Sequence, residues 1–139
     1  MPHAKHVKAE DQVDLTNGDA DDHRLDPAAM LGTWLNTNAT SRGITRVVLE
    51  ARGEKVVMHP YVAGGSLPAD WGEAEAESLY GSNITAKQAI GMVAHFELET
   101  MEAEIQANLN QGLLVVGSFT TLLDGSGRSC YFSREFFHQ

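Results

Sequence analysis

The chain has 139 residues and a mass of 15.1 kDa, and 42% of its residues are hydrophobic, which is enough for a single compact core. Its formal net charge is -9 at pH 7, whereas surfaces that bind phosphate backbones carry clustered Lys and Arg, so we expect no nucleic-acid partner. No apolar stretch approaches the roughly 20 residues of a membrane-spanning helix, so we expect no membrane partner.

The sequence predicts a protein of a reducing compartment. Cys130 is the only cysteine, so an internal disulfide is excluded. It lies between Ser129 and Tyr131, a setting that favours a buried structural thiol over a nucleophile. The N-terminus lacks the apolar block of a secretory signal. We therefore expect a cytoplasmic protein.

Residues 1–25 are rich in charged residues and poor in large apolar ones, so we predict a disordered tail followed by one domain over 26–139. The spacing of His3, His6 and His23 in this tail fits no known ligand pattern. We accordingly predict no metal site, and no motif indicates a cofactor.

The folded part begins with a short helical turn over 26–31, where Asp26 is a suitable N-cap and Pro27 suits the first helical position. From Gly32 onward the hydrophobic periodicity is mainly two, which is typical of strands. Eight strands are predicted, at 32–38, 43–52, 55–62, 73–80, 88–99, 101–110, 112–122 and 128–137.

Two segments are ambiguous. Residues 73–80 alternate acidic and small side chains, but Glu and Ala are strong helix formers, so a helix is an alternative there. Residues 85–90 could likewise form a helical turn before the next strand. The segment 112–122 is almost entirely apolar or small, as in a strand that is covered on both faces or that lines a cavity.

The links between the predicted strands are too short for crossover helices, so successive strands should pair antiparallel. Closing such a sheet removes its exposed edges, which predicts an all-β fold, an eight-stranded antiparallel up-and-down β-barrel. A β-sandwich is the alternative. A barrel with this number of strands either fills its interior with side chains or holds one small ligand.

Gly32-Thr33-Trp34, preceded by a helical turn and combined with an arginine near the last strand, resembles the signature of the calycin superfamily, which includes lipocalins, fatty-acid-binding proteins and avidins. The resemblance implies that Trp34 plugs the closed end of the barrel and that Arg128 or Arg134 packs over its ring, as a cation–π contact would favour. The opening from Gly32 to Asn36 also resembles that of avidins, which implies a ligand contact for Asn36.

His59 and Tyr61 share one face of the strand 55–62 with Val57. If this face is inward, the two side chains supply a pocket with a titratable group and a hydroxyl. An outward histidine is the alternative. Trp71 lies in the long loop that follows this strand, where it either closes over a ligand or pins the loop itself.

For two other strands, the sequence leaves open which face points into the barrel. On 43–52, one arrangement has Arg46 and Glu50 pointing inward as a buried ion pair. In the other arrangement, which is favoured, Val47 and Leu49 point inward and the two charged side chains face water.

On 128–137, Tyr131, Ser133 and Glu135 share one face and Phe132 and Arg134 lie on the other, and both faces carry aromatic rings, so neither is identified as inward.

The leading hypothesis is a barrel that binds an apolar or partly polar small molecule in its interior. Its candidate ligand-binding residues are Asn36, His59, Tyr61, Trp71 and Tyr131. The alternative is a barrel enzyme, an isomerase or cyclase, with His59, Tyr61 or Glu135 as acid or base. A third hypothesis is a non-catalytic interaction module, which includes a homodimer.

Overall fold

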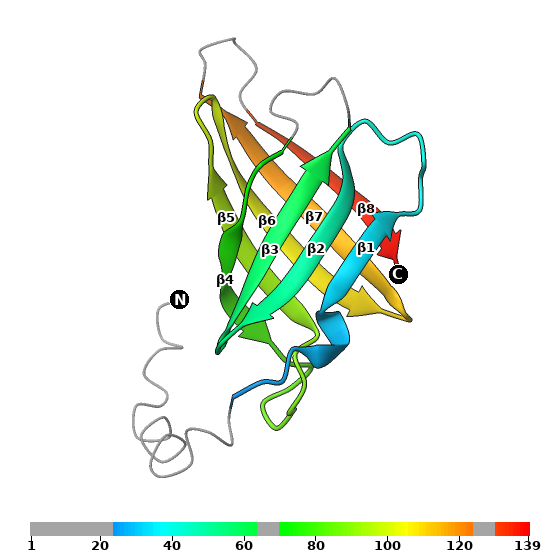
Figure 1. Cartoon of the computed structure of the whole chain (residues 1–139), viewed down its shortest axis with the longest axis vertical. Coiled ribbons are helices and arrows are strands. Elements are labelled where there is room, and N and C mark those ends of the chain that lie inside the picture. The colour runs from blue at the N-terminus through cyan, green and yellow to red at the C-terminus, as the bar shows by residue number, and fades with distance from the viewer. Residues whose placement is uncertain (1–23, 64–69, 124–129) are drawn as a thin grey trace.

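The computed structural model of the chain describes residues 24–63, 70–123 and 130–139 and shows a closed β-barrel (Figure 1). Each of the eight strands pairs antiparallel with the next, and β8 pairs with β1. The predicted all-β, up-and-down barrel is confirmed, and the sandwich alternative is wrong. The predicted tail lies almost entirely in residues 1–23, outside the described part of the chain.

All eight predicted strands are present, with slightly different ends. They are β1 (Gly32–Asn36), β2 (Ile44–Arg52), β3 (Lys55–Val62), β4 (Ala74–Tyr80), β5 (Gly91–Glu97), β6 (Met101–Asn110), β7 (Leu113–Leu122) and β8 (Cys130–His138). Among the described residues the one helical element is a 3-10 turn, Ala28–Met30.

The 3-10 turn forms where the sequence predicts it. The Asp26 carboxylate accepts a hydrogen bond from the Ala28 N–H at 3.0 Å, and Pro27 precedes the turn. These interactions satisfy an N–H group that has no partner within the turn. The turn brings Met30 to the barrel end, where its side chain is completely buried.

Residues 74–80 form a strand because alternate side chains find different environments. Ala74 and Ala76 pack against the core, while Glu75 and Glu77 face away from it. Between β4 and β5, the Asn83 carboxamide oxygen accepts a hydrogen bond from the Thr85 N–H at 2.9 Å in a tight turn, and the chain then runs without a helix to β5. Both helical alternatives are therefore wrong.

The core is built from one side of every strand. On β2, Val47 and Leu49 are buried at 0% and 2% exposure, so the favoured phase is confirmed and Arg46 and Glu50 lie outside. On β8, Phe137 is completely buried. Because side chains alternate along a strand, Tyr131, Ser133 and Glu135 point to the same side as Phe137.

One end of the barrel is closed by Trp34, which is 3% exposed and whose indole N–H donates to the Met30 carbonyl at 2.9 Å. Next to it, Gly32 has φ of 124°, a backbone conformation that residues with a Cβ rarely adopt, so glycine is favoured there. Of the two arginines expected over the ring, Arg134 is not there. Arg134 is exposed and points outward, because it lies three positions before the inward Phe137 and alternate side chains of a strand point to opposite sides. Arg128 lies outside the described residues.

The prediction of a buried Cys130 is wrong: the thiol is exposed at the start of β8. It shares the outward face of this strand with Arg134, and its sulfur lies 3.7 Å from the Thr121 hydroxyl. Separately, within the described ranges no helix has the length and apolar character needed to cross a membrane.

Replacing Trp34 tests the closed end. We expect Trp34→Ala to lower the free energy of unfolding by about 3–5 kcal/mol, because it leaves a cavity and an unpaired Met30 carbonyl. The neighbouring control Leu35→Ala removes a side chain that is 44% exposed and should cost less than about 1 kcal/mol. Urea unfolding measures both, and equal losses would contradict a special role for the indole.

Candidate functional site

The end of the barrel opposite Trp34 contains a cavity of about 110 Å³. It lies where β2 and β8 begin and where β3 and β7 end, at the top of the barrel in Figure 1. The apolar part of its wall consists of Ile44, Val62, Trp71 and Met101. We call this space the mouth cavity.

Two hydroxyl groups lie side by side in the wall of the mouth cavity. Ser118 and Thr120 are inward residues of β7, are 4% and 2% exposed, and their side-chain oxygens are 3.2 Å apart. A hydroxyl has one proton and two acceptor positions. One of the pair therefore donates to the other, and the proton of the second hydroxyl is left for a further acceptor. These residues were not named from the sequence. They could have been found because they lie two positions apart, and so on one face, in the segment 112–122 that was expected to be covered on both faces or to line a cavity.

Trp71 forms a wall of the mouth cavity, in the loop where the sequence placed it. Its side chain is 9% exposed and meets the Phe96 ring edge to face, with centroids 5.8 Å apart. The next residue, Gly72, has φ of 76° and donates its N–H to the Asp70 carboxylate at 2.8 Å, which turns the chain sharply around the indole. Its role in contacting a ligand stays a prediction.

Tyr131 also reaches the mouth cavity, at its rim, and is 55% exposed. Ser133 lies one step further in on the same face of β8.

Glu135, the next inward residue, is engaged in structural contacts. Its Oε1 accepts hydrogen bonds from the Asn36 side chain at 3.1 Å and from the Ser41 hydroxyl at 3.0 Å. The Asn36 amide also donates to the Ile44 carbonyl at 2.8 Å, and its oxygen accepts from the Asn38 N–H at 2.7 Å. Asn36 thus holds the chain together and does not line the mouth cavity.

His59 and Tyr61 lie on the outside of the barrel, so of the two placements left open by the sequence the outward one is observed, and neither side chain lines the interior. The alternate residues Val56, Met58 and Pro60 occupy the interior and are almost completely buried. This placement separates His59 and Tyr61 from Glu135, so the three acid and base candidates do not form one site.

Outside the barrel, His59 and Tyr61 belong to a ladder of polar contacts. His59 Nε2 is 2.7 Å from the Asp70 carboxylate, and its Nδ1 is 3.2 Å from the Tyr61 hydroxyl. A carboxylate only accepts hydrogen bonds, so in neutral His59 Nε2 donates and Nδ1 accepts. The guanidinium of Arg46 lies 4.0 Å from the centre of the Tyr61 ring. We call these four residues the outer ladder.

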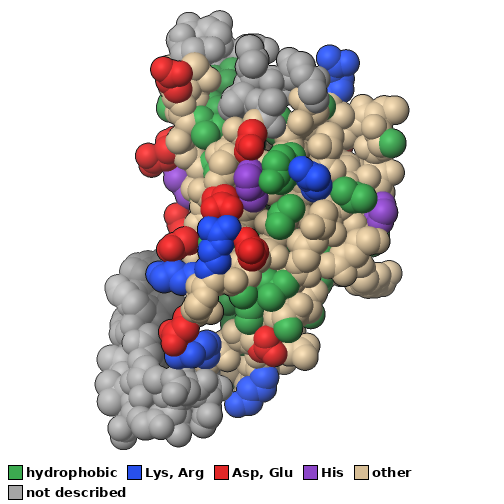
Figure 2. All heavy atoms as spheres, in the orientation of Figure 1, with side chains coloured by type: hydrophobic (Ala, Val, Ile, Leu, Met, Phe, Trp, Pro, Cys, Tyr) green, Lys and Arg blue, Asp and Glu red, His purple; other side chains and the backbone are tan. Residues whose placement is uncertain are grey.

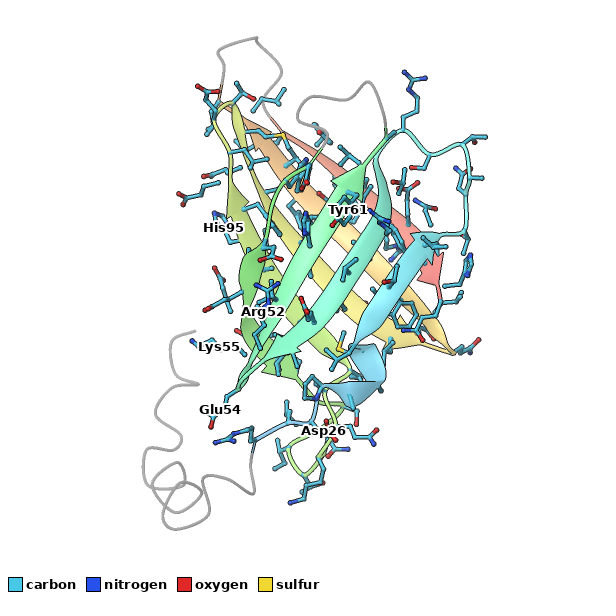
Figure 3. The ribbon with its side chains drawn as sticks, in the orientation of Figure 1. Asp26, Arg52, Glu54, Lys55, Tyr61 and His95 are labelled. Atoms are coloured by element: carbon cyan, nitrogen blue, oxygen red, sulfur yellow. The ribbon has the colours of Figure 1, made fainter. Side chains whose placement is uncertain are left out.

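The outer ladder continues into a group of charged residues lower on the same face (Figures 2 and 3). Arg52 donates two hydrogen bonds to Glu73, both of 2.7 Å, and a third to Glu50. The Arg52 guanidinium lowers the pKa of Glu73 below its ordinary value. The pKa of Asp70 is also lowered, first by the Gly72 N–H and then by His59. The arrangement holds Asp70, and with it the loop that carries Trp71, against β3.

Comparisons of the chain with protein-family models, curated proteins and solved structures gave no match. The calycin signature in Gly32-Thr33-Trp34 therefore stays a resemblance. The candidate site is defined by the geometry of the mouth cavity and of the outer ladder.

The lowered pKa of Asp70 predicts a pH-dependent contribution to stability. The contribution is fully present above the ordinary pKa of 3.8 and is lost as the pH falls through the lower folded value. Asp70→Asn should therefore destabilise the protein at pH 7, and the difference from wild type should shrink below about pH 4. Urea unfolding over a pH series measures this, with Glu77→Gln on β4 as control. A difference independent of pH would contradict the ladder.

Proposed function

We propose that this barrel binds one small, partly polar molecule in the mouth cavity. The observation that carries the proposal is the buried hydroxyl pair of Ser118 and Thr120, which borders this space with a proton available for an acceptor. Small-molecule sites combine a mainly apolar wall with a few fixed polar groups. The mouth cavity combines apolar residues with a larger polar share than that, which includes Arg42 and Tyr131 besides the hydroxyl pair.

The size of the cavity limits the ligand. Its 110 Å³ is well below the roughly 300–1,000 Å³ of pockets for drug-sized molecules. The ligand is therefore a molecule of few non-hydrogen atoms, or the terminal group of a larger one whose remainder lies outside. An acceptor group, such as a carbonyl or ether oxygen, would meet the hydroxyl pair.

The positions of the titratable side chains support binding over catalysis. Glu135 accepts two hydrogen bonds from structural partners, and His59 lies outside the barrel. General acid–base catalysis needs a group within hydrogen-bond reach of the substrate. The isomerase or cyclase hypothesis is therefore less well supported by the described residues.

A thermal-shift screen of small carbonyl and ether compounds tests the proposal. We expect a compound that fits to raise the melting temperature saturably and to change the fluorescence of Trp71, so that Trp71→Phe loses the signal although Trp34 remains. Replacing both hydroxyl residues, Ser118→Ala with Thr120→Val, should weaken binding about tenfold, since a lost hydrogen bond costs about 0.5–1.5 kcal/mol.

The control for the hydroxyl variant is Thr121→Val, which changes the adjacent outward residue of β7. It should bind as wild type does. If no compound stabilises the barrel, or if the double variant binds with unchanged affinity, the mouth cavity is not a ligand site of this kind.

Self-association as a homodimer is a second candidate function, favoured by an apolar surface on β7 and β8. Phe119, Phe132 and Phe136 point outward and are 47%, 54% and 41% exposed. At roughly 200 Å² per aromatic side chain they expose roughly 300 Å² together, comparable with the largest apolar patches of monomeric proteins. A copy related by two-fold symmetry could bring Arg134 of one chain, beside these rings, to Glu104 of the other.

Sedimentation at increasing concentration tests the dimer. Wild type should show a concentration-dependent increase in mass that Phe132→Glu abolishes, because the new carboxylate would be buried unpaired. The outward control Val48→Glu on β2 should leave association unchanged. A strictly monomeric wild type would exclude this function while leaving ligand binding untouched.

We also propose a cytoplasmic location. Exposed Cys130 has no cysteine partner within the chain, and an oxidising compartment would favour its pairing with another molecule. Non-reducing electrophoresis of fresh cell extract should show the monomeric mass. A disulfide-linked form as the main species would contradict this location.

A further inference from the structure

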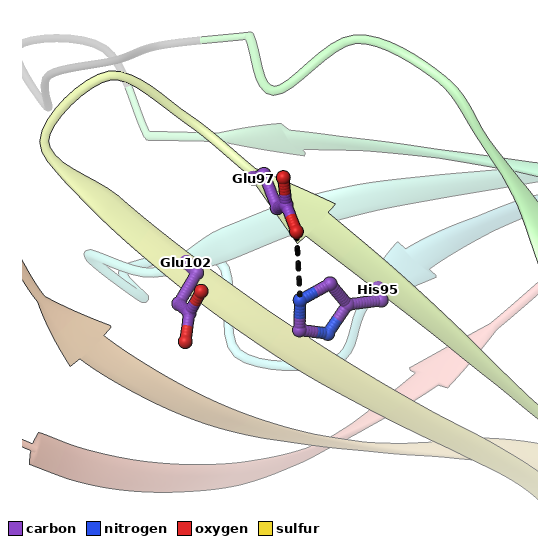
Figure 4. Close-up of side chains that lie close together, drawn as sticks. All are labelled: His95, Glu97 and Glu102. Atoms are coloured by element: carbon purple, nitrogen blue, oxygen red, sulfur yellow. Dashed lines mark ion pairs between the residues drawn. The ribbon is translucent and has the colours of Figure 1, made fainter.

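Three metal-binding side chains meet on the outside of the β5–β6 hairpin, away from the mouth cavity and the outer ladder. They are His95 and Glu97 on β5 and Glu102 on β6 (Figure 4), and their donor atoms all lie within 4.8 Å of one another. His95 Nε2 is 3.8 Å from Oε2 of Glu97. The three residues combine one imidazole nitrogen with two carboxylates.

The strand register brings the two carboxylates together. Glu97 and Glu102 are direct cross-strand partners, and Glu104 is the partner of His95. Like charges directly opposite each other in an antiparallel pair destabilise it. Among the described residues, the ion pair that either of these two carboxylates makes is the contact of Glu97 with His95.

A cation at this position would offset the repulsion between the carboxylates. In the structure, His95 contacts one of the two carboxylates, that of Glu97. An imidazole that contributes a lone pair beside two carboxylates forms a donor set for a divalent transition metal, because imidazole suits Zn²⁺, Ni²⁺ and Cu²⁺ whereas Mg²⁺ and Ca²⁺ prefer oxygen alone.

We propose that His95, Glu97 and Glu102 form a zinc site on the β5–β6 hairpin. Zn²⁺ takes nitrogen and carboxylate ligands at about 2.0–2.2 Å in a tetrahedron, in which neighbouring donors lie roughly 3.4 Å apart. Small rotations of the side chains bring donors now within 4.8 Å to that spacing. Glu97 is 78% exposed at its side chain, which leaves space for such a rotation, and water supplies the fourth ligand.

The site is tested in the full chain with Co²⁺, a paramagnetic ion that tetrahedral zinc sites also bind. Nitrogen–proton NMR spectra reveal where the ion sits, so that binding at this hairpin is distinguished from binding at any other histidine of the chain. At less than one equivalent of Co²⁺, we expect the amide signals of 95–97 and 101–104 to broaden. Excess Zn²⁺ should restore them by displacing Co²⁺.

Two substitutions and one matched control separate the donors from their neighbours. His95→Gln and Glu102→Gln should each weaken the effect on the hairpin signals by at least about tenfold, as expected when one of three ligands is lost. Glu104→Gln is the control. It lies on the same face opposite His95, but its carboxylate accepts a hydrogen bond from Gln106 at 2.9 Å and is not one of the donors.

Thermal unfolding gives a second readout. Zn²⁺ should raise the melting temperature of wild type. Glu102→Gln should raise the melting temperature without metal, because it removes the repulsion between the carboxylates. The same substitution should abolish the further rise with Zn²⁺, because it also removes a ligand. Hairpin signals that do not respond to Co²⁺, or that respond equally in His95→Gln, would overturn the proposal. Neither outcome affects the mouth cavity.

Discussion

The short seam between β1 and β8 is the constraint on which the barrel depends. Its register contains only Leu35 opposite His138 and Asn36 opposite Phe137, with one further backbone bond from the Thr37 N–H to the Phe136 carbonyl. Side chains reinforce this narrow contact, because Glu135 accepts hydrogen bonds from Asn36 and from Ser41. Without the seam the sheet would have two exposed edges and no enclosed interior.

Closure gives the two ends of the barrel different properties. At one end, Trp34 and the turn carrying Met30 fill the opening with large side chains, and the indole N–H is bonded to backbone. At the other end, the hydroxyl residues Ser118 and Thr120 lie among larger side chains such as Trp71, and a cavity remains between them. The closed end is thus filled by large side chains, and the mouth, where we propose that a ligand binds, retains a cavity.

The sequence predicted the strands because alternation is a local property, clearest in 101–110, and it predicted closure because the links are short. It left open whether His59 and Tyr61 point into the barrel, because either face of this strand could be the inner one. The neighbouring strands determine that the face with Pro60 is buried. The hydroxyl pair was hidden in an apolar-looking segment. The meeting of Glu97 with Glu102 depends on hairpin register, which periodicity alone does not fix.

Asp70 and Trp71 are consecutive residues that serve opposite sides of the barrel wall. Asp70 is hydrogen-bonded to His59 on the outside, and Trp71 packs on Phe96 within. The two residues are joined by a single peptide unit, so we expect a displacement of either side chain to shift the other. A change at His59, on the outer surface, should in this way alter the position of the Trp71 indole inside the barrel.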